Sequence, residues 1–159
     1  MRLNLGCGEK LRAGWLNVDI RPLHPSGAEF LCADLRDLDG RVADRSVSEI
    51  AAENVLEFLS WRDLDAALCL LGQKLRPGGG ICVQVPDLEA VVRGNLDNPV
   101  PFLFVERALY GAQAHGEDAH RSAWTAVMLC QRLGMMGLTV QRIEDIRGQL
   151  WARAIREED

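Results

Sequence analysis

The chain has 159 residues, 48% of them hydrophobic and 26% charged, a composition typical of a folded globular domain and not of a disordered segment. Its 18 Lys and Arg against 23 Asp and Glu give a net charge of −5, and because the basic residues are scattered we expect no nucleic-acid partner. The sequence contains no apolar run of about 20 residues and no signal-peptide pattern, so we expect a cytoplasmic protein without membrane association.

The first third of the sequence predicts four short β-strands. Apolar runs at 2–5, 15–20 and 30–33 each stop at a turn signal or an acidic residue, and 47–52 is a fourth, weaker strand. Only residues 6–15 lie between the first two runs. A parallel crossover usually needs a longer connection, so any helix there must be very short.

The middle of the sequence contains the clearest helix. Ser60–Asp63 resembles a capping box, apolar residues recur at helical spacing over 64–75, and the Pro-Gly-Gly-Gly segment 77–80 ends the pattern. Residues 53–59 before it are interpreted as a loop or helical turn, and 81–85 after it as a strand. Strand, helix and strand in this order are typical of a parallel sheet with right-handed crossovers.

The last third begins with a break in this alternation. We expect 88–121 to be an irregular insertion or substrate cap, followed by a helix at 122–135. The strands predicted at 138–143 and 149–155 are joined by too short a turn for a helix, so they should pair antiparallel. The predicted fold class is therefore α/β: one domain over 1–159 with a Rossmann-like doubly wound, mostly parallel sheet and an antiparallel C-terminal strand pair.

A glycine turn follows the first strand, in the segment Leu3–Gly8. Glycines at the carboxyl end of a strand let a ligand approach the backbone, although a purely structural turn is the alternative. A dinucleotide fingerprint would need glycine where Leu11 stands, which disfavours nicotinamide or flavin. The five cysteines are widely spaced without a C-x-x-C pair, so Cys7 is interpreted as a reduced packing residue, with a reactive thiol as the alternative.

Two acidic residues close the next two strands, Asp19 and Asp34. In a parallel sheet both would reach the edge that carries Gly6 and Gly8. One carboxylate can accept hydrogen bonds from both hydroxyls of a ribose, and the other from an exocyclic amine. Together these features indicate a nucleoside site without a phosphate clamp. Each Asp taken alone could instead cap a turn or a helix.

At this point the sequence resembles the class I S-adenosylmethionine-dependent methyltransferases, in particular small bacterial members of that family. The resemblance covers nearly the whole chain and rests on the order and spacing of several motifs. These are Leu3–Gly8, Gly14–Asp19, Ala33–Leu35, Asn54–Glu57, Leu75–Gly79 and Val85–Asp87, with a weaker match at Tyr110–Gly111 and His120–Arg121.

The resemblance implies S-adenosylmethionine as cofactor and S-adenosylhomocysteine as product. It also implies roles for individual residues. Those expected at the cofactor are Gly6, Cys7 and Gly8 at the methionine end, Asp19 at the ribose, Asp34 with Leu35 at the adenine, and Glu53 with Asn54 near the sulfonium and the acceptor.

The sequence departs from this family at two places. Relatives commonly carry His-Val-Leu-Glu-His where this chain has Asn54–Phe58, so both histidines are absent. The chain also begins directly at the first strand, without the N-terminal helices of larger relatives. We therefore expect an open cofactor site, or one closed by another subunit.

The acceptor side is predicted within the insertion. We assign catalysis to His120, as a general base that titrates near neutrality, together with Asn54. Tyr110, Asp118 and Arg121 are expected to contact the substrate. The cluster His115, Glu117, Asp118 and His120 could be a solvated loop, a substrate contact or a metal site, but its spacing matches no known ligand motif, so no metal is predicted.

The leading interpretation is a methyltransferase that acts on a small-molecule or sugar-containing acceptor. The alternative is a non-catalytic S-adenosylmethionine-binding or scaffold module, and a nicotinamide oxidoreductase ranks third. The apolar run Phe102–Val105 could line the acceptor pocket or form a dimer face, so a homodimer is a further expectation.

Overall fold

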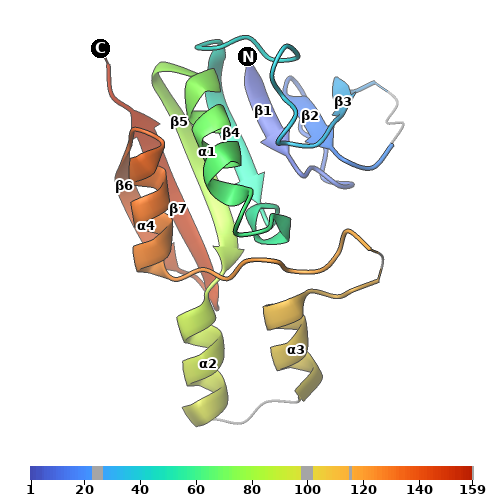
Figure 1. Ribbon diagram of the computed structural model, residues 1–159, viewed down its shortest axis with the longest axis vertical. Helices are drawn as coiled ribbons and strands as arrows, with labels where there is room; N and C mark the ends of the chain where they lie inside the picture. The colour runs from blue at the N-terminus through green and yellow to red at the C-terminus, as the bar shows by residue number, and fades with distance from the viewer. Residues whose placement is uncertain (23–26, 98–101, 115, 159) are drawn as a thin grey trace.

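The computed structural model describes residues 1–22, 27–97, 102–114 and 116–158. Within these residues, seven strands form one sheet in the order β3-β2-β1-β4-β5-β7-β6 (Figure 1). The strands are β1 (Arg2–Leu5), β2 (Leu16–Asp19), β3 (Phe30–Cys32), β4 (Val47–Glu53), β5 (Leu75–Pro86), β6 (Leu138–Asp145) and β7 (Gln149–Arg156).

The strand pairing confirms the predicted Rossmann-like topology. β1 pairs in parallel with β2 and β4, β2 with β3, and β4 with β5. β7 runs antiparallel to β5 and β6 antiparallel to β7, which is the predicted C-terminal pair. Because Leu5 lies opposite both Val18 and Ala52, the carboxyl ends of the first strands meet at one edge of the sheet.

Helices α1 (Leu64–Lys74) and α4 (Ala126–Met135) pack side by side on one face of the sheet (Figure 1). The strand residues beneath them form cross-strand rows of apolar side chains. One row runs through Leu3, Ile50, Ile81 and Ala154, all of which are fully buried. This layer is the hydrophobic core, and it fixes which face of each strand points inward.

Two connecting loops pack against parts of the sheet that no helix of the described residues covers. Between β3 and β4, residues 33–46 place Leu35, Leu38 and Val42 in the core. On the opposite face, the β1–β2 connection lies over Asn4 and Asn17: the Asn4 amide donates to the Lys10 carbonyl at 2.9 Å, and the Arg12 backbone donates to the Asn17 side chain at 2.9 Å. The short connection expected at 6–15 is therefore a packed loop.

The start of α1 differs from the predicted capping box. The helix begins at Leu64 with Asp63 at the N-cap and no side-chain cap. The Ser60 hydroxyl accepts only a 3.3 Å hydrogen bond from the Arg62 backbone, within a turn that precedes the helix. The glycine segment that was expected to end the helix lies inside β5. A Cβ on Gly79 would lie 2.9 Å from the carbonyl oxygens of Arg76 and Val47, so close backbone packing requires glycine there.

Residues 88–121, expected to be irregular, contain two helices, α2 (Leu88–Asp97) and α3 (Phe102–Tyr110). They lie against each other beyond the end of the sheet (Figure 1). Gly94 and Asn95 stay inside α2, since one glycine lowers helix stability without forbidding the helix. Pro99 and Pro101 lie outside the described residues. None of the described helices is long and apolar enough to cross a bilayer.

Candidate functional site

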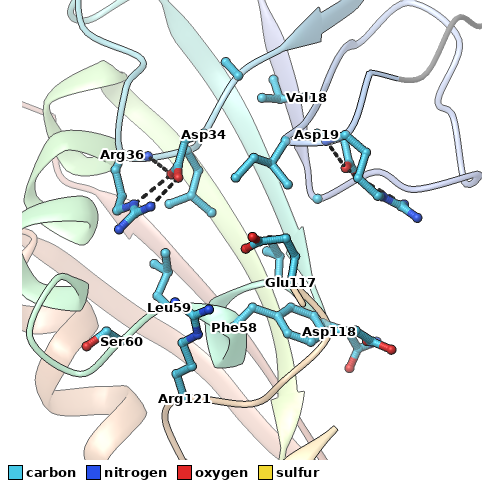
Figure 2. Close-up of a pocket in the computed structure, with 17 residues that line it drawn as sticks. Val18, Asp19, Asp34, Arg36, Phe58, Leu59, Ser60, Glu117, Asp118 and Arg121 are labelled. Atoms are coloured by element: carbon cyan, nitrogen blue, oxygen red, sulfur yellow. Dashed lines mark hydrogen bonds and ion pairs between the residues drawn. The ribbon is translucent and has the colours of Figure 1, made fainter. Parts of the chain in front are cut away.

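A cavity of about 260 Å³ opens at the carboxyl ends of the first strands (Figure 2). One wall is formed by residues that follow β1, β2, β3 and β4. The wall residues among the sequence-predicted site are Gly6, Asp19, Asp34, Leu35 and Asn54. The structure thus brings together residues that are separated by up to about a third of the chain, at the edge predicted from the carboxyl ends of parallel strands.

Asp19 is almost fully buried at the cavity wall. Its Oδ2 accepts from the Gly8 backbone at 2.8 Å, and its Oδ1 accepts from the backbone and Nε of Arg21 at 2.9 and 3.1 Å. Burial raises the pKa of Asp19, but the hydrogen bonds from Arg21 and Gly8 outweigh it and hold the pKa below its ordinary value. The carboxylate is therefore ionised at neutral pH and joins the glycine turn to the end of β2.

Asp34 has the same arrangement at the end of β3. Its two oxygens accept from Arg36, through Nε at 3.0 Å and Nη2 at 2.5 Å, and this pairing lowers the pKa of Asp34. Arg36 also binds Asp63, just before α1, at 2.9 Å. Figure 2 shows Asp34 and Asp19 on the same side of the cavity, with Arg36 beside Asp34. Arg36 therefore links two loops that wall the site.

Glu53 does not line this cavity, although it closes β4. Its carboxylate binds Arg12 at 2.6 Å. All three acidic residues that were predicted at the cofactor, Asp19, Asp34 and Glu53, are thus paired with an arginine. The negative charge that the sequence suggests for this edge is largely neutralised.

The glycine turn is fixed by backbone geometry. Gly6 and Gly8 have φ angles of +59° and +49°, in the left-handed region that favours glycine. A Cβ on Gly6 would lie 2.6 Å from Cβ of Val55, so this glycine is also required by packing. Cys7 between them is buried, and burial raises the pKa of its thiol to about 11. A protonated, buried thiol is unreactive, which favours the packing interpretation of Cys7.

Replacing Gly6 by alanine tests this close contact. Gly40 has a similar φ of +72° but nothing within 4 Å of its Cβ position, so Gly40→Ala measures the backbone strain alone. We expect Gly40→Ala to lower the free energy of unfolding by about 1–2 kcal/mol. Gly6→Ala should cost a further 1–3 kcal/mol or so through overpacking against Val55. Urea unfolding of both variants measures the difference, and equal losses would contradict the contact.

The second wall begins after β4. Asn54 adopts a left-handed φ of +50° and leads into a single 3₁₀ turn, η1 (Leu56–Phe58). This turn agrees with the loop or helical turn predicted at 53–59. Phe58, Leu59 and Ser60 line the cavity from this turn. The Glu57 carbonyl accepts from the backbone of Arg121 at 2.8 Å and of Ser122 at 3.2 Å. Residues 116–124, here called the strap, are thereby docked onto η1.

The strap brings two of the three predicted substrate residues to the cavity. Asp118 and Arg121 line it together with Glu117, and Figure 2 shows Glu117 and Arg121 directed toward the strand ends. Tyr110 is 57% exposed and is not part of this wall. His115 lies outside the described residues, which contain no group of acidic, His or Cys side chains able to hold a metal.

His120 lies behind the strap. Its ring packs edge-on against Phe58 at 5.2 Å between centroids, and its Nδ1 lies 3.2 Å from the Ala108 carbonyl oxygen. It lines a second, smaller cavity beside Trp124. Burial lowers the pKa of His120, so the imidazole is neutral at pH 7. The structure does not bring this predicted base to the wall of the main cavity.

Several residues of the site were missed from the sequence. Ile20 and Leu59 supply apolar wall, and Arg21 and Arg36 hold the two aspartates. The arginines did leave a signal, because each stands two positions after its acid. An Asp-x-Arg pattern at a strand end, seen twice, predicts a local ion pair in which the arginine folds back onto the carboxylate.

Comparison with known proteins gives structural matches only. No family model and no curated protein matches the sequence. A chain of the complex between the Haloferax volcanii Trm112 methyltransferase activator and a putative methyltransferase has a TM-score of 0.69 at 15% identity, covering 99% of this chain and 82% of that one. A Methanosarcina mazei S-adenosylmethionine-dependent methyltransferase has a TM-score of 0.69 at 15% identity, covering 99% and 92%.

A third structure contains ligands. The Burkholderia thailandensis 1,6-didemethyltoxoflavin-N1-methyltransferase, with bound 1,6-didemethyltoxoflavin and S-adenosylhomocysteine, has a TM-score of 0.66 at 14% identity and covers 99% of this chain and 71% of that one. Similarity at this level of identity establishes architecture. The chain therefore has the Rossmann-like fold of the class I S-adenosylmethionine-dependent methyltransferases.

Proposed function

We propose that the protein is an S-adenosylmethionine-dependent methyltransferase that acts on a small-molecule or sugar-containing acceptor. The observation that carries this proposal is the convergence of Asp19 and Asp34 on one cavity, beside the Gly6–Gly8 turn. Two ionised carboxylates on neighbouring strand ends offer acceptors to a ribose diol and to an exocyclic amine. The fold supports the same cofactor, since it is shared with enzymes that use it.

The residues present fit this cofactor. Asp19 would hold the ribose hydroxyls, and Asp34 would accept from the adenine amine while Ile20 and Leu35 give apolar contact to the ring. The backbone of the glycine turn would receive the methionine end, with Asn54 near the sulfonium, whereas the Glu53 carboxylate is held by Arg12 outside the cavity. The bound cofactor supplies an already electrophilic methyl group, so this chain has only to align the acceptor and accept its proton.

The acceptor would enter between the cofactor and the strap. Asp118 and Arg121 line this space from the strap, and Asn54 lines it from the end of β4. Arg121 has no side-chain partner among the described residues, so its guanidinium is available to a substrate. His120 is separated from the cavity by its packing on Phe58, and it could act as a base only if the strap moved.

Calorimetric titration with S-adenosylmethionine, S-adenosylhomocysteine and NAD tests the cofactor assignment. We expect micromolar binding of the two adenosyl ligands and none of NAD, because the dinucleotide fingerprint is incomplete at Leu11. Binding of NAD, or of none of the three, would contradict the proposal.

The alternative, a non-catalytic module that keeps the cofactor, is favoured by one observation: no imidazole among the described residues lines the main cavity. Incubation with methyl-labelled cofactor and a small-molecule extract distinguishes the two. Transfer that Asn54→Ala abolishes while cofactor affinity stays unchanged supports the enzyme. Binding without transfer supports the module. We propose separately that the protein forms a homodimer, and analytical ultracentrifugation tests this by measuring its molecular mass in solution.

A further inference from the structure

The Arg21 guanidinium lies at the acidic residue that would bind ribose. Its Nε is 3.1 Å from Oδ1 of Asp19 and its Nη2 is 3.5 Å from Oδ2. Arg21 also lines the main cavity. Neither the fold nor the comparisons assign a role to this side chain.

The hydrogen-bonding capacity of Asp19 is already used within the chain. A carboxylate offers about four acceptor positions. Asp19 receives the backbone N–H of Gly8 at 2.8 Å, the backbone N–H of Arg21 at 2.9 Å, and the two side-chain donors of Arg21. A ribose diol brings two further donors, so it can bind this carboxylate only if two of the four present donors leave.

The donors that can leave are those of the arginine side chain. The Gly8 and Arg21 backbone groups are fixed by the turn and by the end of β2, and they make the two shortest of the four bonds. The guanidinium makes the two longest bonds, and its side chain is 43% exposed, so it can rotate into solvent. Release of Arg21 therefore frees acceptor positions on both oxygens without unfolding anything.

A second observation places the same group over the glycine turn. The Arg21 Nη2 lies 3.2 Å from the position that a Cβ on Gly8 would occupy. The guanidinium thus covers both the carboxylate and the backbone at which a ligand would approach the strand end. Arg36 is held differently, because it binds Asp63 as well as Asp34 and is tied into the wall at two points.

The geometry points to Arg21 as a further residue of the cofactor site, whose side chain competes with the ribose for Asp19 and so sets the affinity for the cofactor. This inference rests on the proposed function, because it takes Asp19 as the ribose ligand. The arginine holds the carboxylate ionised and oriented, and the cofactor replaces its side-chain hydrogen bonds with those of the diol.

Arg21→Met tests the competition, since methionine has an unbranched apolar side chain of similar length and removes the side-chain donors while the backbone N–H of residue 21 stays. We expect two changes of opposite sign. The dissociation constants of S-adenosylmethionine and S-adenosylhomocysteine should fall about three- to tenfold, because the competitor is gone. The melting temperature of the protein alone should fall, because the almost fully buried Asp19 carboxylate loses its ion pair. A purely structural role would lower stability without tightening binding.

Arg142→Met is the matched control. Arg142 also pairs with an acid two positions away, Glu144, but on β6 at the far end of the sheet. It removes the same charge and should leave both dissociation constants unchanged. Unchanged or weaker binding by Arg21→Met, with the wild type binding normally, would overturn the inference alone. If neither the wild type nor Arg21→Met binds either ligand, the cofactor assignment fails and this inference fails with it.

Discussion

Asp19→Ala should weaken binding of S-adenosylmethionine by about ten- to a hundredfold. The reason is that the ribose diol donates charge-assisted hydrogen bonds to this one side chain in exchange for those of Arg21, so we expect a net loss equal to about one such bond, on the order of 1.5–3 kcal/mol. The carboxylate is almost fully buried, and its lowered pKa keeps it ionised. A bound diol donates two hydrogen bonds to this charged acceptor, in place of the two from the Arg21 side chain. Isothermal titration of the purified variant measures the loss.

The control for this variant is Asp37→Ala, which removes an equally charged but exposed residue that pairs only loosely with Arg41 at 3.6 Å. It should bind the cofactor as the wild type does. Because Asp19→Ala also leaves the Gly8 backbone N–H without its acceptor, the circular dichroism of the variant has to be compared with the wild type. A folded Asp19→Ala protein with wild-type affinity would remove Asp19 from the cofactor site.

Most strands, and the sheet edge at which Asp19 and Asp34 meet, followed from the sequence because both depend on local signals. Each early strand is an apolar run with a sharp end, and the residue at that end must lie at the carboxyl edge of a parallel sheet. Asp19 and Asp34 could therefore be assigned before their separation was known. The antiparallel pair β6–β7 followed from a turn too short to hold a helix.

Features that depend on tertiary contacts could not be predicted from these local signals. The α1 N-terminus carried a capping-box pattern, but the preceding turn uses the Ser60 carbonyl for the backbone of Asp63 and Leu64, so the helix starts later. The glycine segment was interpreted as a helix stop, yet Gly79 within it serves the close approach of β4 to β5. Neither the capping-box pattern nor the glycine segment indicates which part of the chain will pack against it.

His120 shows the same limit within the site. A histidine in a polar segment suggests a base, and its position one residue before Arg121 suggests a shared cavity. In the structure the two neighbours line different cavities: Arg121 lines the main one, and His120 lines the smaller one and packs on Phe58. The placement depends on how the backbone at 120–122 is held by Tyr110 and Glu57, which are distant in the sequence, so local signals could not predict it.

Glu57 is a buried acidic residue whose ionisation makes stability depend on pH. Its side chain is 1% exposed, and its Oε2 has no hydrogen-bond partner among the described residues. Burial raises the pKa of this carboxyl to about 8. At neutral pH the folded protein therefore carries Glu57 mainly in its neutral form, whereas the unfolded chain, with an ordinary pKa near 4.5, ionises it.

The pH dependence of stability follows from this difference. Between about pH 4.5 and pH 8 the folded state binds one more proton at Glu57 than the unfolded state, so the free energy of unfolding decreases as the pH rises. The contribution is fully present below pH 4.5 and is lost by the time the pH passes about 8. Its total size is on the order of 3–5 kcal/mol, a large part of the stability of a small domain.

Glu57→Gln should abolish this dependence, because the amide has nearly the same shape and cannot ionise. We expect the variant to be equal to or slightly less stable than the wild type at pH 5, where its extra buried N–H lacks a partner, and more stable by several kcal/mol at pH 8. Urea unfolding across this range measures the crossing. Glu157→Gln, at an exposed position, is the control and should follow the wild-type curve.

Because the Glu57 carbonyl anchors the strap through Arg121 and Ser122, ionisation of the Glu57 carboxyl at high pH should also loosen the acceptor wall. Stability curves of wild type and Glu57→Gln that stay parallel from pH 5 to pH 8 would show that Glu57 ionises normally in the folded protein.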